Sequence, residues 1–385
     1  MSPEQSKLQS KMQTWAKSFK KRDPAIDILK GIAIILMVYA HAFPWCIYFL
    51  RLYIPMIFLV VSGYCQKSHI ASFSEWKRFM LGKVKSIYVP CAVCNGIFAL
   101  LGGLFLRIHF YTDDPAFLEM TKSWPYPQKL YTVNGIGEIL TKFVKCVLMM
   151  DTTQLGNATW FLIVMFGICL MYSTFQLLIS KFPERHRQLL KYAMFAVCVI
   201  VGQLLDPSVT AMRFVRCQIY CLIGFLIGVW FKHREHPYFY TPFTTGLAVF
   251  VIAVVSQLHP FDLANANEPV HIAFISAVAG WIFMYPLSHA VLFYSRISRA
   301  LQYVGKHTLS ILCLHMIGFK VVSLMLLKVR ELPIIYLASF HTIIDASQLW
   351  KLLYAAYGVL LPLAVSAAWS WFAGRTFRRA GKQKA

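Results

Sequence analysis

The sequence predicts an all-α fold, a polytopic transmembrane helical bundle of about ten helices, and composition and patterning carry that prediction. Of the 385 residues, 58% are hydrophobic and only 14% are charged, whereas soluble domains average about 45–50% apolar residues even when glycine is counted. The apolar residues form long blocks. The blocks show neither the two-residue period that is typical of a half-buried strand nor the 3.6-residue period that is typical of a half-buried helix.

Each block is close to the length that a helix needs to cross a hydrocarbon layer of about 30 Å. We see no internal repeat, no low-complexity linker and no separate soluble domain, so residues 26–373 are predicted to form a single transmembrane domain. In chain order the predicted spans are 26–43, 48–66, 86–107, 159–180, 189–206, 214–231, 240–258, 270–292, 308–328 and 350–372.

Lysine and arginine collect in alternate connections, which predicts the orientation of the chain. The N-terminus, the C-terminal tail and the connections after the second, fourth, sixth and eighth spans are basic. The opposite side receives Asp113, Asp114, Glu119, Asp262 and Glu268. This pattern predicts a multi-pass protein with both termini in the cytoplasm. It also explains the net charge of +22, so nucleic acid is not an indicated partner.

Both ends of the chain are basic. Residues 1–25 lack the apolar core of a cleavable signal peptide, and Leu8, Met12, Trp15 and Phe19 recur at helical spacing among lysines. This pattern is typical of a cytoplasmic amphipathic helix on an anionic leaflet, and a disordered basic tail fits equally well. Residues 374–385 are predicted to be a second basic cytoplasmic tail.

The first span carries three polar residues, Asp27, Lys30 and His41. At 100° per residue, the step of eleven residues from Lys30 to His41 returns to within about 20° of one helix face, about 16 Å along the axis. Asp27 lies one turn before Lys30, close to the same face. An ionisable residue inside a membrane helix is expensive to bury and is therefore a candidate functional residue.

Several stretches resemble, in order, the landmarks of the acyltransferase-3 family of integral membrane acyltransferases, whose sugar and glycan O-acetylases share a basic residue, ten others and then histidine. Residues 27–41, DILKGIAIILMVYAH, match that first-helix pattern with Lys30 and His41. The later landmarks are IPMIFLVVSGY (54–64), KVKSIYVP (83–90), TWFL (159–162) and YVGKHTLSILCLH (303–315).

The resemblance implies transfer of an acyl group, usually acetyl from acetyl-CoA, to a hydroxyl of a glycan or lipid-linked saccharide, in a bacterial plasma membrane. Coenzyme A is made in the cytoplasm, and its phosphates need cations there. Lys30, Lys83 and Lys85 are the candidates. The pantetheine arm would bring the thioester beside His41, the candidate general base, whose usual pKa near 6.5 suits that work. An acyl-histidine relay is an alternative.

Five further residues are candidate supporting residues, each with a structural alternative. Asp27 either orients Lys30 or is an ordinary acid at a helix N-terminus. Ser62 and Gly63 either approach the thioester or pack helices. Trp160 lines the acceptor vestibule or belongs to an aromatic belt, and His315 acts in the site or makes a hydrogen bond between helices.

Two other function classes remain open at this point. About ten spans with a buried histidine and lysine would also suit a proton-coupled secondary transporter, although we find no inverted repeats or broken helices in matching halves. A non-catalytic scaffold that binds glycans or lipids is the third class. The cysteines and histidines show no metal-ligand spacing, so no metal cofactor is expected.

Overall fold

The structure is a computed structural model that describes residues 23–43, 47–66, 70–124, 128–132, 135–233, 237–343 and 346–382. Within these ranges every long element is a helix and no strand occurs, so the predicted fold class is confirmed. The predicted amphipathic helix within residues 1–22 lies outside the described residues, and so do the side chains of the basic tail from residue 373.

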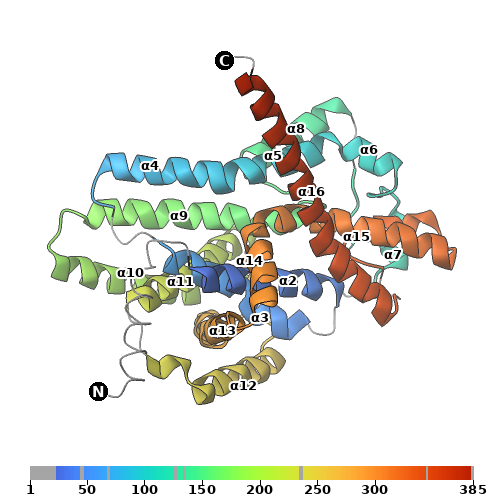
Figure 1. Ribbon diagram of the computed structural model, residues 1–385. Coiled ribbons are helices and arrows are strands. Elements are labelled where there is room, and N and C mark those ends of the chain that lie inside the picture. Colours follow the sequence, from blue (N-terminus) through green and yellow to red (C-terminus); the bar gives the residue numbers. More distant parts are fainter. Residues whose placement is uncertain are drawn as a thin grey trace.

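The helices follow the chain as shown in Figure 1. In order they are α2 (Pro24–Ala42), α3 (Ile47–Tyr64), α4 (Phe73–Lys83), η2 (Val84–Tyr88), α5 (Val89–Leu100), α6 (Gly102–Arg107), α7 (Pro115–Met120), α8 (Ile136–Val147), η3 (Asn157–Thr159), α9 (Trp160–Ile179), α10 (Glu184–Leu204), α11 (Thr210–His233), η4 (Pro237–Tyr240), α12 (Pro242–Leu258), α13 (Val270–Val291), α14 (Ser295–Lys306), α15 (Thr308–Arg330), η5 (Ile334–Ala338) and α16 (Gln348–Lys382).

Every predicted span contains a helix. Within the described part of the chain, seven helices are long and apolar enough to cross a membrane, and α3 and α12 are apolar but shorter. The third predicted span, 86–107, is instead divided among η2, α5 and α6. The N–H of Val89 bonds to the carbonyl of Val84, a π-type turn, and Pro90, which lacks an N–H, follows it. Gly102 and Gly103, poor helix formers, follow the second break at Leu101.

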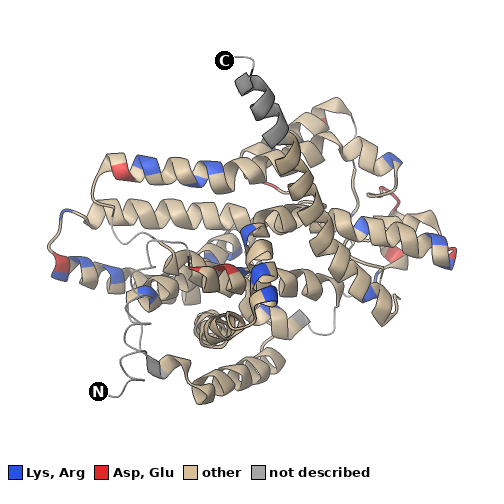
Figure 2. Ribbon diagram, in the orientation of Figure 1, with Lys and Arg blue, Asp and Glu red and all other residues tan. Residues whose placement is uncertain are grey.

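Two polar helices fall in connections that the sequence analysis did not assign as helical. Lys and Arg gather on α4 and α14, whereas α9, α12 and α13 are almost free of charge (Figure 2). Helix α14 crosses α2 steeply (Figure 1), and glycines let the two backbones touch. A Cβ atom on Gly31 would lie 2.2 Å from the carbonyl oxygen of Leu301, and one on Gly305 would lie 1.8 Å from that of Asp27. This crossing fixes the end of α2 that carries Asp27 and Lys30.

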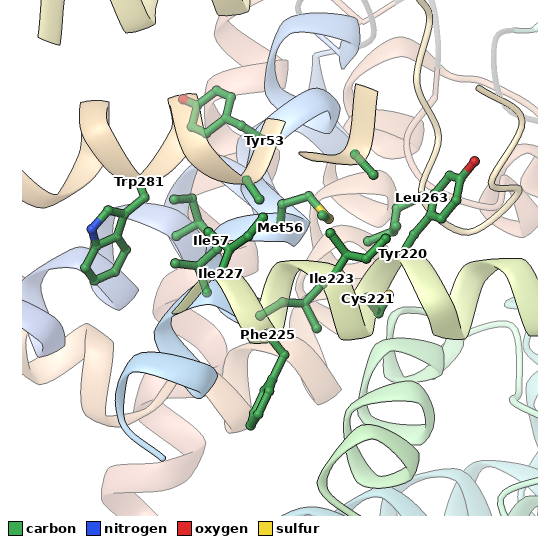
Figure 3. Close-up of a cluster of buried hydrophobic side chains, with 14 of the residues drawn as sticks. Tyr53, Met56, Ile57, Tyr220, Cys221, Ile223, Phe225, Ile227, Leu263 and Trp281 are labelled. Atoms are coloured by element: carbon green, nitrogen blue, oxygen red, sulfur yellow. The ribbon is translucent and has the colours of Figure 1, made fainter. Parts of the chain in front are cut away.

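Helices α2, α3, α11 and α13 contribute to the largest buried apolar cluster. Figure 3 shows Met56 and Ile57 of α3 beside Ile223 and Ile227 of α11. The backbones of the same helix pair touch at Gly63 and at Gly228, where a Cβ atom would lie 1.9 Å from the carbonyl oxygens of Phe225 and Val60 respectively. Small residues at such crossings are typical of membrane helix packing.

Substituting Gly63 is therefore expected to destabilise the bundle. In Gly63→Ala the new methyl group meets backbone atoms that cannot rotate away, and such overpacking costs about 1–3 kcal/mol or more. The matched control is Gly82→Ala in α4, since a Cβ atom there meets nothing within 4 Å. The midpoint temperature of thermal unfolding in detergent is expected to fall for Gly63→Ala only. Equal midpoints for both variants would contradict the close approach of α3 and α11.

Candidate active site

Three histidines meet at the C-terminal end of α2. The ring of His41 stacks on that of His315 from α15, with centroids 5.3 Å apart and planes 19° apart. The ring of His341, from the segment between η5 and α16, meets His41 edge-on at 4.8 Å. His315 and His341 are buried, and His41 is partly exposed. We call His41, His315 and His341 the histidine cluster.

Hydrogen bonding leaves acceptor nitrogens in the histidine cluster. The Nδ1 atom of His315 lies 3.0 Å from the carbonyl oxygen of Ile311 and 3.1 Å from that of Leu312. Because these carbonyl oxygens can only accept, His315 Nδ1 carries the hydrogen and Nε2 carries a lone pair. That Nε2 atom, like Nδ1 of His41, is buried and has no hydrogen-bond partner among the described residues. Such atoms are suited to receive a proton or a hydroxyl hydrogen bond from a bound substrate.

A buried lysine holds the segment that carries His341. Lys320 of α15 is 2% exposed, and its ammonium donates to the carbonyl oxygens of Leu337 at 2.6 Å and Ser339 at 2.8 Å. The side-chain oxygen of Gln128 accepts from the N–H of Phe340 at 2.7 Å. These bonds to residues flanking His341 fix its position beside His41.

Positive charge surrounds His341. Burial is the main cause that holds the pKa of the His341 imidazole well below its usual range, and repulsion from positive charge on the neighbouring side chains of His315, Arg51, Lys320 and Lys129 acts in the same direction. His341 is therefore neutral near pH 7. The charge of Arg51 also acts on His41, although Arg51 lies 3.9 Å from the carboxylate of Asp262.

The other end of α2 carries a lysine cluster. Asp23 caps α2 by accepting from the N–H of Ala25 at 2.9 Å, and Pro24 begins the helix. The buried carboxylate of Asp27 pairs with the Lys30 ammonium at 2.8 Å. Since an ammonium has three donors, this contact leaves Lys30 two others.

Lys30, Lys83 and Lys232 lie near enough to Cys65 for their charges to act on its thiol, and the carboxylate of Asp23 acts on it as well. The Lys83 ammonium lies 5.1 Å from the centre of the Phe79 ring. Lys232 also donates to the backbone carbonyl of Gln66. We call Lys30, Lys83 and Lys232 the lysine cluster. Helix α2 runs without a break from Pro24 to Ala42, so Lys30 and His41, one member of each cluster, lie toward its opposite ends.

The remaining candidate residues are less clearly placed. Lys85 is exposed on η2, and its charge is not among those that act on Cys65. The Ser62 hydroxyl donates to the carbonyl oxygen of Phe58 at 2.8 Å, and Gly63 packs α3 on α11. Trp160 begins α9 and contacts Phe161 at 5.9 Å between ring centroids. Ser62 and Gly63 thus have the packing contacts of the structural alternative, and the functional roles of all four residues stay predictions.

Sequence reasoning missed His341 and Lys232. His341 stands in an irregular segment with no helical period, and only the long-range contacts of Lys320 and Gln128 bring it to His41. Lys232 is one of many basic residues at a helix end, so its type alone gave no signal. Among the described residues, no group of three or more His, Cys, Asp or Glu side chains is arranged to hold a metal ion.

These features define a class of protein: a multi-pass, all-helical membrane protein with imidazoles at one end of a transmembrane helix and ammonium groups at the other. A family model described as an acyltransferase domain matches residues 23–370, nearly the whole chain. The chain therefore belongs to the acyltransferase-3 family and is a membrane acyltransferase. No curated protein and no solved structure gave a match.

Proposed function

We propose that this protein is an O-acyltransferase that moves an acetyl or other short acyl group from cytoplasmic acyl-CoA to a hydroxyl of a glycan or lipid-linked saccharide at the outer side of the cell membrane. The observation that carries the proposal is the placement of open imidazole nitrogens and a lysine cluster at opposite ends of α2 in a member of an acyltransferase family. The orientation, with both termini in the cytoplasm, rests on the distribution of charged residues.

The reaction needs one proton acceptor. The acceptor hydroxyl oxygen attacks the thioester carbonyl carbon while an open ring nitrogen of His41 removes the hydroxyl proton. The tetrahedral intermediate then collapses and the carbon–sulfur bond breaks. The protonated His41 gives the proton that it took from the hydroxyl to the departing coenzyme A sulfur. The products are an ester and the free thiol of coenzyme A. His315 and His341 position His41, since their rings stack on it and meet its edge.

The lysine cluster would hold the phosphates of the donor. The charges of Lys30, Lys83 and Lys232 all act on Cys65, and these three cations outnumber the two carboxylates at this end of α2, Asp23 and the Asp27 that pairs with Lys30. Charge-assisted hydrogen bonds to phosphate are among the stronger polar contacts in proteins. The pantetheine arm would then follow α2 over the ~16 Å between Lys30 and His41.

Purified protein with radiolabelled acetyl-CoA and a lipid-linked saccharide fraction tests this proposal. We expect label to appear in an alkali-labile ester of the saccharide, with one free coenzyme A thiol released for each ester. A proton-coupled transporter would instead accumulate label inside vesicles without forming an ester. Uptake without ester formation would therefore overturn the proposal, as would the absence of thiol release with every saccharide fraction that contains free hydroxyls.

Lys320 offers a test of the positioning of His341. In Lys320→Met the carbonyls of Leu337 and Ser339 lose their donor, and the segment that carries His341 is released. We expect kcat to fall by about 10²-fold with little change in KM for acetyl-CoA, because displacement of a positioned group by about 1 Å can cost that much. Lys328→Met, an exposed lysine on the same helix, is the control. An unchanged kcat in Lys320→Met would contradict the positioning role.

A further inference from the structure

A cavity lies between α10, α11 and α13, and its lining residues Phe231 and His233 flank Lys232 of the lysine cluster. Its volume is about 720 Å³, and its walls are almost entirely apolar and aromatic, with Phe195, Trp230 and Phe274 among them. That volume lies within the range of sites that bind small molecules, about 300–1,000 Å³. Tyr192, Trp230 and Phe274 at its rim are 54%, 39% and 41% exposed, so the cavity opens toward the lipid-facing side of the bundle.

A polar cavity of about 350 Å³ adjoins the apolar one. Gln188, Lys191 and His233 line both, so the two form one elongated space with an apolar part and a polar part. Arg187 and Glu184, also in the polar part, pair with each other at 2.6 Å. Lys191 has no carboxylate partner among the described residues, so the polar part carries net positive charge.

A buried amide points to the chemistry that the polar part would bind. Gln176 of α9 lines this part and is only 4% exposed. Its Nε2 donates to the Tyr172 hydroxyl at 2.9 Å, whereas its Oε1 has no donor among the described residues. A buried acceptor without a donor is unfavourable. A ligand with a hydroxyl group beside a negative charge would satisfy both Gln176 and Lys191.

We propose that this cavity binds an anionic glycerophospholipid with a hydroxyl-bearing headgroup, such as phosphatidylglycerol. The acyl chain lies in the apolar part, the phosphate lies at Lys191, and a headgroup hydroxyl donates to Gln176. The basic end of the cavity lies beside the connection between α9 and α10, which the charge distribution predicts to face the anionic cytoplasmic leaflet. The residues that would bind the lipid headgroup, Lys191 and Gln176, belong to neither cluster, so the proposal can be tested separately from the catalytic one.

The loose packing of α10 gives this lipid a structural role. Cys198 and Gly202 are the buried residues of α10, and only 11% of its apolar stretch is buried inside the bundle. An acyl chain in the cavity would fill the space between α10 and its neighbours α11 and α13. A ligand that binds only the folded state raises its stability, so the bound lipid is expected to raise the midpoint temperature of unfolding.

Native mass spectrometry of the full chain in detergent tests the proposal, with phosphatidylglycerol and phosphatidylcholine of matched chains as probes. We expect phosphatidylglycerol to be retained preferentially and to raise the unfolding midpoint. Lys191→Gln is expected to weaken its binding about fivefold, given about 1 kcal/mol per basic residue near anionic lipid. Lys181→Gln removes the same charge from an exposed residue outside both cavities, and is expected to leave binding unchanged.

A second variant, Val278→Trp, fills the apolar part and is expected to remove lipid retention while Lys191 remains. Equal retention of the two lipids, or equal loss in Lys191→Gln and Lys181→Gln, would overturn the proposal. Displacement of the lipid by acetyl-CoA in proportion to acetyl-CoA bound would overturn it too, because the cavity would then hold the donor. None of these readouts depends on acyl transfer, so the failure of this proposal and that of the proposed reaction can be told apart.

Discussion

Replacing His41 with alanine is expected to lower kcat for acyl transfer by about 10²–10⁴-fold, the range that a positioned general base contributes. His41 supplies a buried Nδ1 atom without a partner in the described residues, and both neighbouring imidazoles are oriented around it. The rate of ester formation with labelled acetyl-CoA is the measurement. Because the substitution removes a ring from the end of α2 and leaves α2 itself intact, membrane insertion and donor binding should survive.

His289→Ala is the matched control. Like His41 in α2, His289 lies in the last turn of a transmembrane helix, α13, but it does not belong to the histidine cluster. Its turnover should stay within a few-fold of that of the unaltered protein. Substantial turnover in His41→Ala, with normal insertion, would reject His41 as the base. Trapping of an acyl group on His41 after donor addition without acceptor would replace direct transfer with the relay mechanism.

Replacing Lys30 with methionine is expected to raise KM for acetyl-CoA by about 10-fold or more, because a hydrogen bond to a charged group contributes about 1.5–3 kcal/mol. The effect on kcat should be smaller, since Lys30 lies about 16 Å from His41 along α2. The decisive comparison uses a truncated thioester donor that lacks the nucleotide phosphates. With that donor, Lys30→Met and the unaltered protein should have the same KM.

Lys85→Met serves as the control, because Lys85 is exposed on η2 and lies outside the lysine cluster. Its KM should change little with either donor. If Lys30→Met raised KM equally for acetyl-CoA and for the truncated donor, loss of the ion pair with Asp27, and not loss of a phosphate contact, would explain the result.

The long apolar blocks were sufficient to predict most of the spans, because a membrane helix must satisfy all its backbone hydrogen bonds internally. The exception is 86–107, where the structure divides the apolar block among η2, α5 and α6. The sequence was also sufficient for the relation of Lys30 to His41. Both residues lie on one helix, where spacing alone determines the relative direction of side chains, and α2 has no proline beyond its first turn to disturb that spacing.

Residues outside that helix required the structure. His341 reaches His41 through contacts between distant segments, chiefly the bonds from Lys320, and no local pattern encodes such contacts. Gly63 illustrates the opposite case, in which a motif residue that was a candidate for the thioester site packs against the backbone of Phe225. A motif therefore identified the family more securely than it assigned a role to each of its residues.

An experimental structure with a non-hydrolysable acetyl-CoA analogue bound would show whether the donor extends along α2 from the lysine cluster to the histidine cluster. We expect the nucleotide phosphates within hydrogen-bond distance of Lys30 and of at least one of Lys83 and Lys232. We also expect the carbonyl carbon of the analogue beside His41, leaving room for an acceptor oxygen at about 3–3.5 Å. Phosphates bound away from the lysine cluster, or an acyl group that ends away from the histidine cluster, would contradict this path of the donor.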